Sequence, residues 1–167
     1  MATTTKGSAV LTLPTDTEIL VTREFNAPRH HVWKVLTEPD LIKRWWAGRR
    51  GTVTHASVDL RVGGTWRYVM TADGGFEVGF HGEFREIDAP AGMVQTEVYE
   101  GAPDGDSEPT LNHYTLTERD GRTTLTVRTV APSKELRDTI IASGMEGGMQ
   151  EGYDLLEELA ADLTASE

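Results

Sequence analysis

Apolar and polar residues alternate through much of this chain, in short stretches bounded by Gly, Pro, Asn and Asp. Alternation with a period of two is typical of half-buried strands, and the bounding residues are those of turns. The pattern predicts a first strand over Glu18–Phe25. Because Asp73-Gly74 and Asp120-Gly121 are hairpin turn signals, we expect the later strands to pair antiparallel. These later strands are predicted over residues 52–60, 65–71, 76–87, 93–99, 112–118 and 123–130.

Apolar residues spaced three or four positions apart occur after the first strand and again at the C-terminal end. This spacing predicts two short helices, over Arg29–Thr37 and Asp40–Trp46, and one long helix over Lys134–Leu163 capped by Ser133. We expect an α+β fold: a curved antiparallel sheet of about six or seven strands wrapped around the long C-terminal helix, with the short helices after the first strand.

Residues 1–16 follow neither pattern, and we expect them to form a mobile N-terminal arm. Residues 17–164 then form a single domain, since a chain of 167 residues is long enough for one core of its own. We find no apolar run that would span a membrane and no secretory signal. The absence of cysteine excludes disulfides, thiolate metal sites and a cysteine nucleophile. We therefore expect a cytoplasmic protein without membrane insertion.

The net charge of −11 argues against nucleic-acid binding. One segment differs from the acidic remainder, because Lys43, Arg44, Arg49 and Arg50 surround the pair Trp45-Trp46. Its flanking glycines would let it move as a lid. It is interpreted as a lid, as a docking patch for an anionic or acidic partner, or as plain surface with its Trp side chains turned inward.

The predicted last helix carries glycines on its apolar face, where Leu is expected. Gly148 and Gly152 lie on this face, and the glycines of the helix together cost roughly 3–4 kcal/mol relative to Ala. Two explanations are open. The helix backbone approaches its neighbours closely, or the missing side chains leave a hollow between helix and sheet. Met145 and Met149 favour the hollow, because Met lines adaptable pockets.

Several short motifs follow one another in a specific order along most of the chain. They are Arg23–Pro28, Val32-Trp33, Thr37–Pro39, Arg44–Trp46, Asp59–Arg67, Gly82–Ile87 and Ser143–Tyr153. In this order the chain resembles the helix-grip (START-like, or SRPBCC) superfamily, which contains START lipid-binding domains, polyketide cyclases and Bet v 1-like proteins. Within it, the chain is most similar to the bacterial family related to the activator of heat-shock protein 90 ATPase (AHSA1-type). The resemblance implies the helix-grip fold, with binding, cyclisation or chaperone activation as functions.

In such a fold the long helix and the inner sheet face line a cavity. The alternative is that the same residues simply form the core, but the glycines and the aromatic residues with polar tips favour a ligand pocket. Strand alternation also places Val98, Leu116 and Val127 on the inner face. The predicted ligand-binding residues are Trp46, Trp66, Tyr68, Met70, Phe80, Phe84, Tyr114, Met145, Gly148, Met149, Gly152 and Tyr153.

Residues for catalysis or metal binding are sparse. The five histidines form no close cluster, so we expect neither a metal site nor a cofactor. His81 and Glu83 share a strand face and are expected to pair there. There is no GxSxG nucleophile motif, and Tyr68 and Tyr114 are the inner candidates for acid–base chemistry. No catalytic residue is assigned, and a binding protein is favoured over an enzyme.

Three functions follow from the sequence and the resemblance. The first is a small-molecule binding protein, which holds an apolar or amphipathic ligand, lipid or polyketide-like, between sheet and C-terminal helix. The second is a co-chaperone-like activator of the heat-shock protein 90 ATPase, with a chaperone as partner. The third is an enzyme of the polyketide cyclase or aromatase type. In each case we expect a monomer or a homodimer.

Overall fold

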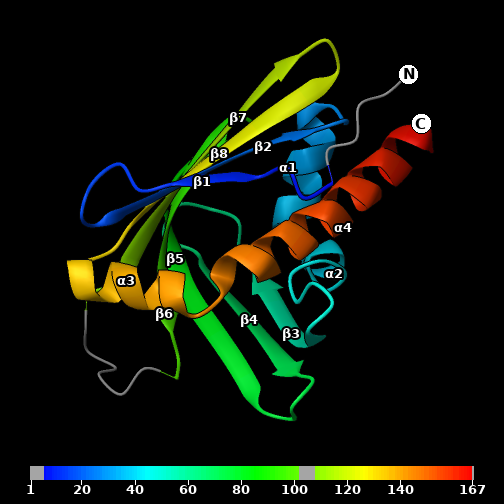
Figure 1. The fold of residues 1–167 in the computed structure, drawn as a ribbon. Coiled ribbons are helices and arrows are strands. Elements are labelled where there is room, and N and C mark those ends of the chain that lie inside the picture. The colour runs from blue at the N-terminus through cyan, green and yellow to red at the C-terminus, as the bar shows by residue number, and fades with distance from the viewer. Residues whose placement is uncertain (1–5, 102–107, 167) are drawn as a thin grey trace.

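One antiparallel sheet of eight strands dominates the fold, with the spatial order β1-β2-β8-β7-β6-β5-β4-β3. The computed structural model describes residues 6–101 and 108–166. The strands are β1 (Val10–Thr12), β2 (Glu18–Phe25), β3 (Gly51–Val58), β4 (Thr65–Ala72), β5 (Glu77–Asp88), β6 (Gly92–Tyr99), β7 (Thr110–Arg119) and β8 (Arg122–Val130). The helices are α1 (Arg29–Thr37), α2 (Pro39–Ile42), α3 (Lys134–Ala142) and α4 (Met145–Ala165). The sheet curves around α4, which confirms the expected helix-grip α+β architecture (Figure 1).

The strand register defines which side chains face α4. Residues directly opposite one another in a sheet share a face, and Met93, Tyr114, Val127 and Val21 form one such row from β6 to β2. Since alternate residues of a strand share a face, Gln95, Glu97 and Tyr99 lie on the same side of β6 as Met93. The Val98 side chain therefore lies on the other face, paired with His81 and contrary to the prediction, although Val98 still borders the pocket described below. Apolar residues occur at both parities of this strand, so its composition did not identify the inner face.

A buried arginine ties α4 to the sheet. The Arg23 side chain on β2 is 1% exposed, and its guanidinium lies 2.8 Å from Asp154 Oδ1 and 2.7 Å from Glu157 Oε1, both on α4. The guanidinium carbon also lies 4.6 Å from the centre of the Phe25 ring. A buried charge is tolerated only when it is paired, and here the pairing fixes the position of α4 across the sheet.

The predicted continuous helix over Lys134–Leu163 is wrong, because the chain forms α3 and α4 instead. The break is at Gly144, whose φ of +83° lies in the left-handed region that favours glycine. Ser133 caps α3 as expected, since its hydroxyl accepts a hydrogen bond from Leu136 N at 3.1 Å. After the break the chain changes direction, so α3 and α4 lie at an angle (Figure 1).

Two smaller predictions also need correction. Within the expected N-terminal arm, β1 pairs with the free edge of β2, and the Gln150 side chain bonds to Ala9 N at 3.1 Å and to Ala9 O at 2.8 Å. Residues 1–5 of that arm lie outside the described residues. The second short helix ends at Ile42, earlier than predicted, and turns follow to Arg49. None of the helices in the described residues is both long and apolar enough to cross a membrane.

Candidate functional site

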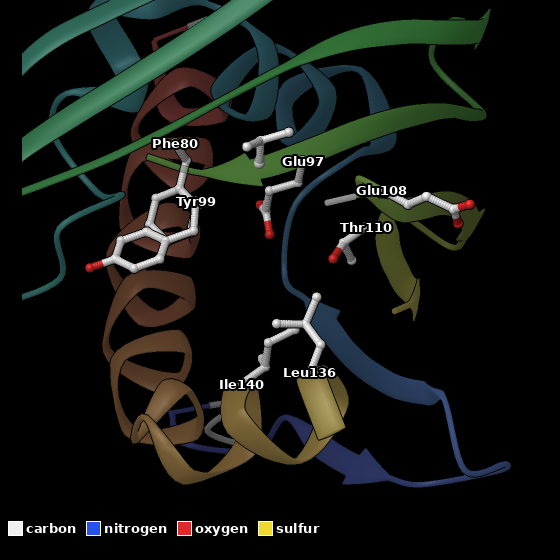
Figure 2. A pocket seen from close by; sticks show the side chains of 8 residues that line it. Phe80, Glu97, Tyr99, Glu108, Thr110, Leu136 and Ile140 are labelled. Atoms are coloured by element: carbon white, nitrogen blue, oxygen red, sulfur yellow. The ribbon is translucent and has the colours of Figure 1, made fainter. Parts of the chain in front are cut away.

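A pocket of about 90 Å³ lies between the end of β6 and α3 (Figure 2). On the same scale a water molecule needs roughly 10–15 Å³, so the pocket has room for several waters or a small organic group. Its lining combines an apolar wall with two carboxylates and the hydroxyl-bearing residues Tyr99 and Thr110. The lining residues are Phe80, Glu97, Val98, Tyr99, Glu108, Thr110, Leu136 and Ile140.

Glu97 is the inward-facing carboxyl of this pocket. Figure 2 shows its carboxylate pointing from β6 into the space between Tyr99 and Leu136. Burial raises the pKa of Glu97 to about 7, and a hydrogen bond from the Asn112 side chain opposes that rise. The Thr129 hydroxyl donates to Asn112 Oδ1 at 2.9 Å, so the amide nitrogen remains available to Glu97. No basic side chain of the described residues contributes to the pKa of Glu97.

Three tyrosines from different elements lie close enough to Glu97 for its charge to act on their pKa values. Burial is the main cause that raises the pKa of Tyr68 on β4, Tyr114 on β7 and Tyr153 on α4, and the charge of Glu97 raises each of them further. The Tyr114 hydroxyl accepts a hydrogen bond from Gln95 Nε2 at 3.3 Å. The sheet and α4 therefore bring several polar tips into one interior region.

Two of these hydroxyls lack a partner among the described residues. Tyr68 and Tyr153 are 8% and 9% exposed, and neither hydroxyl forms a hydrogen bond with the described part of the chain. In that part, the only fully enclosed side-chain nitrogen or oxygen without a partner is Arg23 Nε. Neither tyrosine hydroxyl is therefore fully enclosed, and solvent reaches both.

An aromatic cluster adjoins the pocket and contains several predicted site residues. The Trp46 ring centre lies 5.5 Å from Tyr68 and 5.7 Å from Phe80, and Phe80 lies 5.2 Å from Tyr99. Trp66 stacks at 4.7 Å against Tyr68, but it is 2% exposed. Trp66 and Phe84, which is 1% exposed, belong to the packed core, and neither lines the pocket. Trp46, Tyr68 and Phe80 therefore form one aromatic cluster, whereas Phe84 is packed in the core.

The glycines of α4 have different surroundings at different positions. A Cβ atom added at Gly148 would meet nothing within 4 Å, so open space adjoins this residue. A Cβ at Gly152 would lie 3.3 Å from the Trp45 carbonyl oxygen and 3.4 Å from its ring, which is close packing. Met145 and Met149 are partly buried beside Gly148, and Met70 is partly buried near the end of β4.

The basic segment around Trp45 and Trp46 is fastened to the start of α4. Glu151 accepts a hydrogen bond from Arg49 N at 3.2 Å and forms an ion pair with Arg50 at 3.3 Å. Trp45 Nε1 donates to Val35 O at 2.9 Å. The Trp side chains are turned inward, and the segment covers the first turns of α4.

Charged residues on the outer sheet face pair differently from the prediction. His81 Nδ1 lies 2.8 Å from Glu100 rather than contacting Glu83, which pairs with Arg85 at 3.3 Å. Arg67 forms two hydrogen bonds of 2.9 Å with Glu100. Hydrogen bonding by Arg67 is the largest cause that lowers the pKa of Glu100 to about 2. This cluster is exposed and lies away from the pocket. No group of three His, Asp or Glu in the described part of the chain is arranged to hold a metal ion.

The sequence reasoning missed Glu97, Asn112 and Arg23. The signal for Glu97 was ambiguous, because it shares the parity of Met93 and Tyr99 while Val94 and Val98 occupy the other parity of the strand. The signal for Arg23 was clearer, since Arg23 is two residues from Val21 and Phe25. Its charge nevertheless led to the expectation of an outward side chain.

Comparisons with known proteins agree with this fold. A family model described as "Activator of Hsp90 ATPase homolog 1-like protein" matches residues 26–161. A solved structure from Rhodobacter sphaeroides is 27% identical with a TM-score of 0.83, over 92% of this chain and 98% of that chain. One from Mycobacterium smegmatis is 25% identical with a TM-score of 0.81, over 90% of this chain and 96% of that chain. An AHSA1-like protein from Aeromonas hydrophila, 22% identical with a TM-score of 0.64 over 87% of this chain and 94% of that chain, shows the fold alone. No curated protein matches the chain.

Because the family model spans residues 26–161, the chain belongs to the family of Activator of Hsp90 ATPase homolog 1-like proteins. This membership confirms the resemblance drawn from the motifs. The family and its fold fit a ligand-binding or co-chaperone-like role in general, with a small molecule or a chaperone as partner.

Proposed function

We propose that this member of the Activator of Hsp90 ATPase homolog 1-like family binds a small amphipathic molecule between the sheet and its C-terminal helices. The apolar part of the ligand lies against Phe80, Tyr99, Leu136 and Ile140. Its polar end points toward Glu97. Such a mixture of apolar walls and a few convergent polar groups is typical of small-molecule sites.

The observation that carries this proposal is the pocket between β6 and α3, in which the Glu97 carboxyl faces an otherwise largely apolar lining. The hydroxyls of Tyr68 and Tyr153 support it. Both residues are more than nine-tenths buried, yet neither hydroxyl is fully enclosed and neither has a partner in the described part of the chain. Most buried polar side-chain atoms in proteins are hydrogen-bonded, so two such hydroxyls suit a polar partner from outside the chain.

Acid–base catalysis on the bound molecule is the second candidate, and Glu97 favours it. A carboxyl with a pKa of about 7 suits general acid–base work near neutral pH. The tyrosines suit this work less, because burial raises their pKa above the ordinary value and opposes loss of their protons. A cyclase or aromatase-type reaction would therefore depend on Glu97. Loss of turnover in Glu97→Gln with retained ligand affinity would identify it.

Native mass spectrometry tests the binding proposal. The purified protein is measured under gentle and denaturing conditions, and the stripped protein is then titrated with amphipathic probes. We expect a retained or added small molecule, and we expect Gly148→Leu to weaken binding because its side chain enters the open space beside Gly148.

Ala161→Leu is the matched control, since Ala161 lies on the exposed side of α4. It should bind as the parent does. If Gly148→Leu and Ala161→Leu bind equally well, the space beside Gly148 is not part of the site. If the stripped protein ignores every probe, the binding proposal is wrong and a role through a protein partner, such as the co-chaperone alternative, takes its place.

A further inference from the structure

We infer that the ligand of this pocket is a cation: an ammonium group on an apolar body, held by the Glu97 carboxylate beside the aromatic rings of Phe80 and Tyr99. This inference rests on the proposed function, because it names the chemical class of the molecule bound at the same site.

The charges that line the pocket are of one sign. Glu97 points into it and Glu108 borders it, and no Lys, Arg or His is among the described lining residues. Glu97 also lacks a basic partner elsewhere in the described chain. An ionised carboxylate in a low-dielectric site is stabilised by an opposite charge within a few ångströms. A bound ammonium supplies that charge.

The net charge of the chain, −11, acts in the same direction. A strongly acidic protein raises the local concentration of cations around it and speeds their association. A ligand anion would be opposed both by this field and by the two pocket carboxylates.

The hydrogen-bonding groups also match an ammonium head. An ammonium nitrogen donates and does not accept, so it needs acceptors around it. The Glu97 carboxylate and the Thr110 hydroxyl, both in the pocket lining, are acceptors. The donor that faces this carboxyl is the Asn112 side chain, because the Gln95 amide donates to the Tyr114 hydroxyl. One amide is a weak site for an anionic head group.

The aromatic walls provide a third contribution. Cations are attracted to the faces of aromatic rings within about 6 Å, and this attraction strengthens when water is excluded. Phe80 and Tyr99 line the pocket with their ring centres 5.2 Å apart, and Trp46 packs on Phe80. These rings suit a methylated as well as a primary ammonium.

The titration of Glu97 makes this inference testable by pH. The titratable groups around Glu97 are Tyr68 from β4, Tyr114 from β7, Tyr153 from α4 and Glu108 at the pocket edge. The tyrosines stay neutral near pH 7, since burial raises their pKa. With a pKa of about 7, Glu97 is mostly protonated at pH 6 and mostly ionised at pH 8. Cation affinity should therefore rise about tenfold between these pH values.

Isothermal titration calorimetry of the full chain provides the test. The probes are alkylammonium, alkanol and alkanoate, each with chains of six and of ten carbons, at pH 6 and pH 8 and constant ionic strength. We expect the alkylammonium to bind most tightly and to gain about tenfold between pH 6 and pH 8. In Glu97→Gln the cation should bind more weakly and lose this gain, whereas Glu158→Gln on the exposed side of α4 should behave as the parent does.

The outcomes separate the two proposals. Tighter binding of the alkanol or the alkanoate overturns the cation inference and leaves the binding proposal standing. Cation binding that does not change with pH, or that survives Glu97→Gln intact, also overturns the inference. If no probe of any charge binds, both proposals are wrong. Thermal melting of each variant verifies that it is folded, and the pH dependence of the parent protein needs no variant.

Discussion

Gly148 and Gly152 lie about one turn apart on α4, and the structure surrounds them differently. Replacing Gly by Ala in a helix interior stabilises the helix by about 1 kcal/mol when the new methyl group fits. At Gly148 the methyl group meets nothing within 4 Å, so the full gain is expected. Gly148→Ala should therefore raise the free energy of unfolding by about 1 kcal/mol, which for a domain of this size is a rise of about 2–4 °C in Tm.

At Gly152 the same substitution meets an obstacle. The methyl group would lie 3.3 Å from the Trp45 carbonyl oxygen, and that oxygen is held by a hydrogen bond of 2.9 Å from Gly48 N. The carbonyl must shift by a few tenths of an ångström, and the strain offsets the gain in helix propensity. We expect Gly152→Ala to be neutral or destabilising. Gly152→Leu should lose about 1–3 kcal/mol, the usual cost of overpacking.

Urea unfolding followed by tryptophan fluorescence measures both effects, with an unchanged m-value as the sign of an unchanged two-state transition. The difference between Gly148→Ala and Gly152→Ala is the informative quantity, because both carry the same change in intrinsic helix propensity. Equal stabilisation of the two variants would mean that Trp45 does not approach the helix backbone. Destabilisation by Gly148→Ala would refute the open space beside that residue.

Three further predictions concern other parts of the fold. Arg23→Met should lower the free energy of unfolding by about 3–5 kcal/mol in urea, because it leaves Asp154 and Glu157 without their cation at a helix–sheet contact. Ser133→Ala should cost about 1 kcal/mol in the same assay, since it removes the cap of α3. The folded pKa of Glu97 is raised to about 7 from an ordinary value of 4.5, so the folded state holds the proton more tightly. The contribution of Glu97 to stability should therefore decline as pH rises from about 4.5 through 7, and comparison of melting curves should show a smaller decline in Glu97→Gln.

Much of the fold could be predicted where local signals agreed with the final packing. The bounds of β2 and α1 follow from the strand spacing of Ile19, Val21 and Phe25, then the Asn26-Ala27-Pro28 turn, then apolar residues at helical spacing. These signals lie within a few residues of one another and do not depend on distant contacts. The face of β6 could not be read in this way, because Val94 and Val98 compete with Met93 and Tyr99. The pairing of β6 with β5 and β7 determines which of its side chains face inward, and this pairing depends on residues distant in the sequence.

The glycines of the C-terminal region show even more clearly that local sequence does not predict tertiary packing. In the sequence, Gly144, Gly148 and Gly152 stand four residues apart and look alike. In the structure the first breaks the helix, the second borders open space, and the third admits Trp45. Gly144 differs from the others in its backbone conformation, and Gly148 and Gly152 differ in their neighbours. The spacing of the glycines in the sequence predicts neither property.

The helix break at Gly144 places α3 where it forms one wall of the pocket. If residues 134–163 continued as a single helix, Leu136 and Ile140 would extend along the axis of α4, past the region where β6 ends. The left-handed Gly144 instead turns α3 away from that axis, and the same two side chains close one wall of the pocket opposite Glu97 (Figure 2). Burial of Glu97, which raises its pKa, thus depends on a turn that only glycine adopts without strain. The residue that made the long-helix prediction fail is the one that allows this fold to enclose a carboxyl.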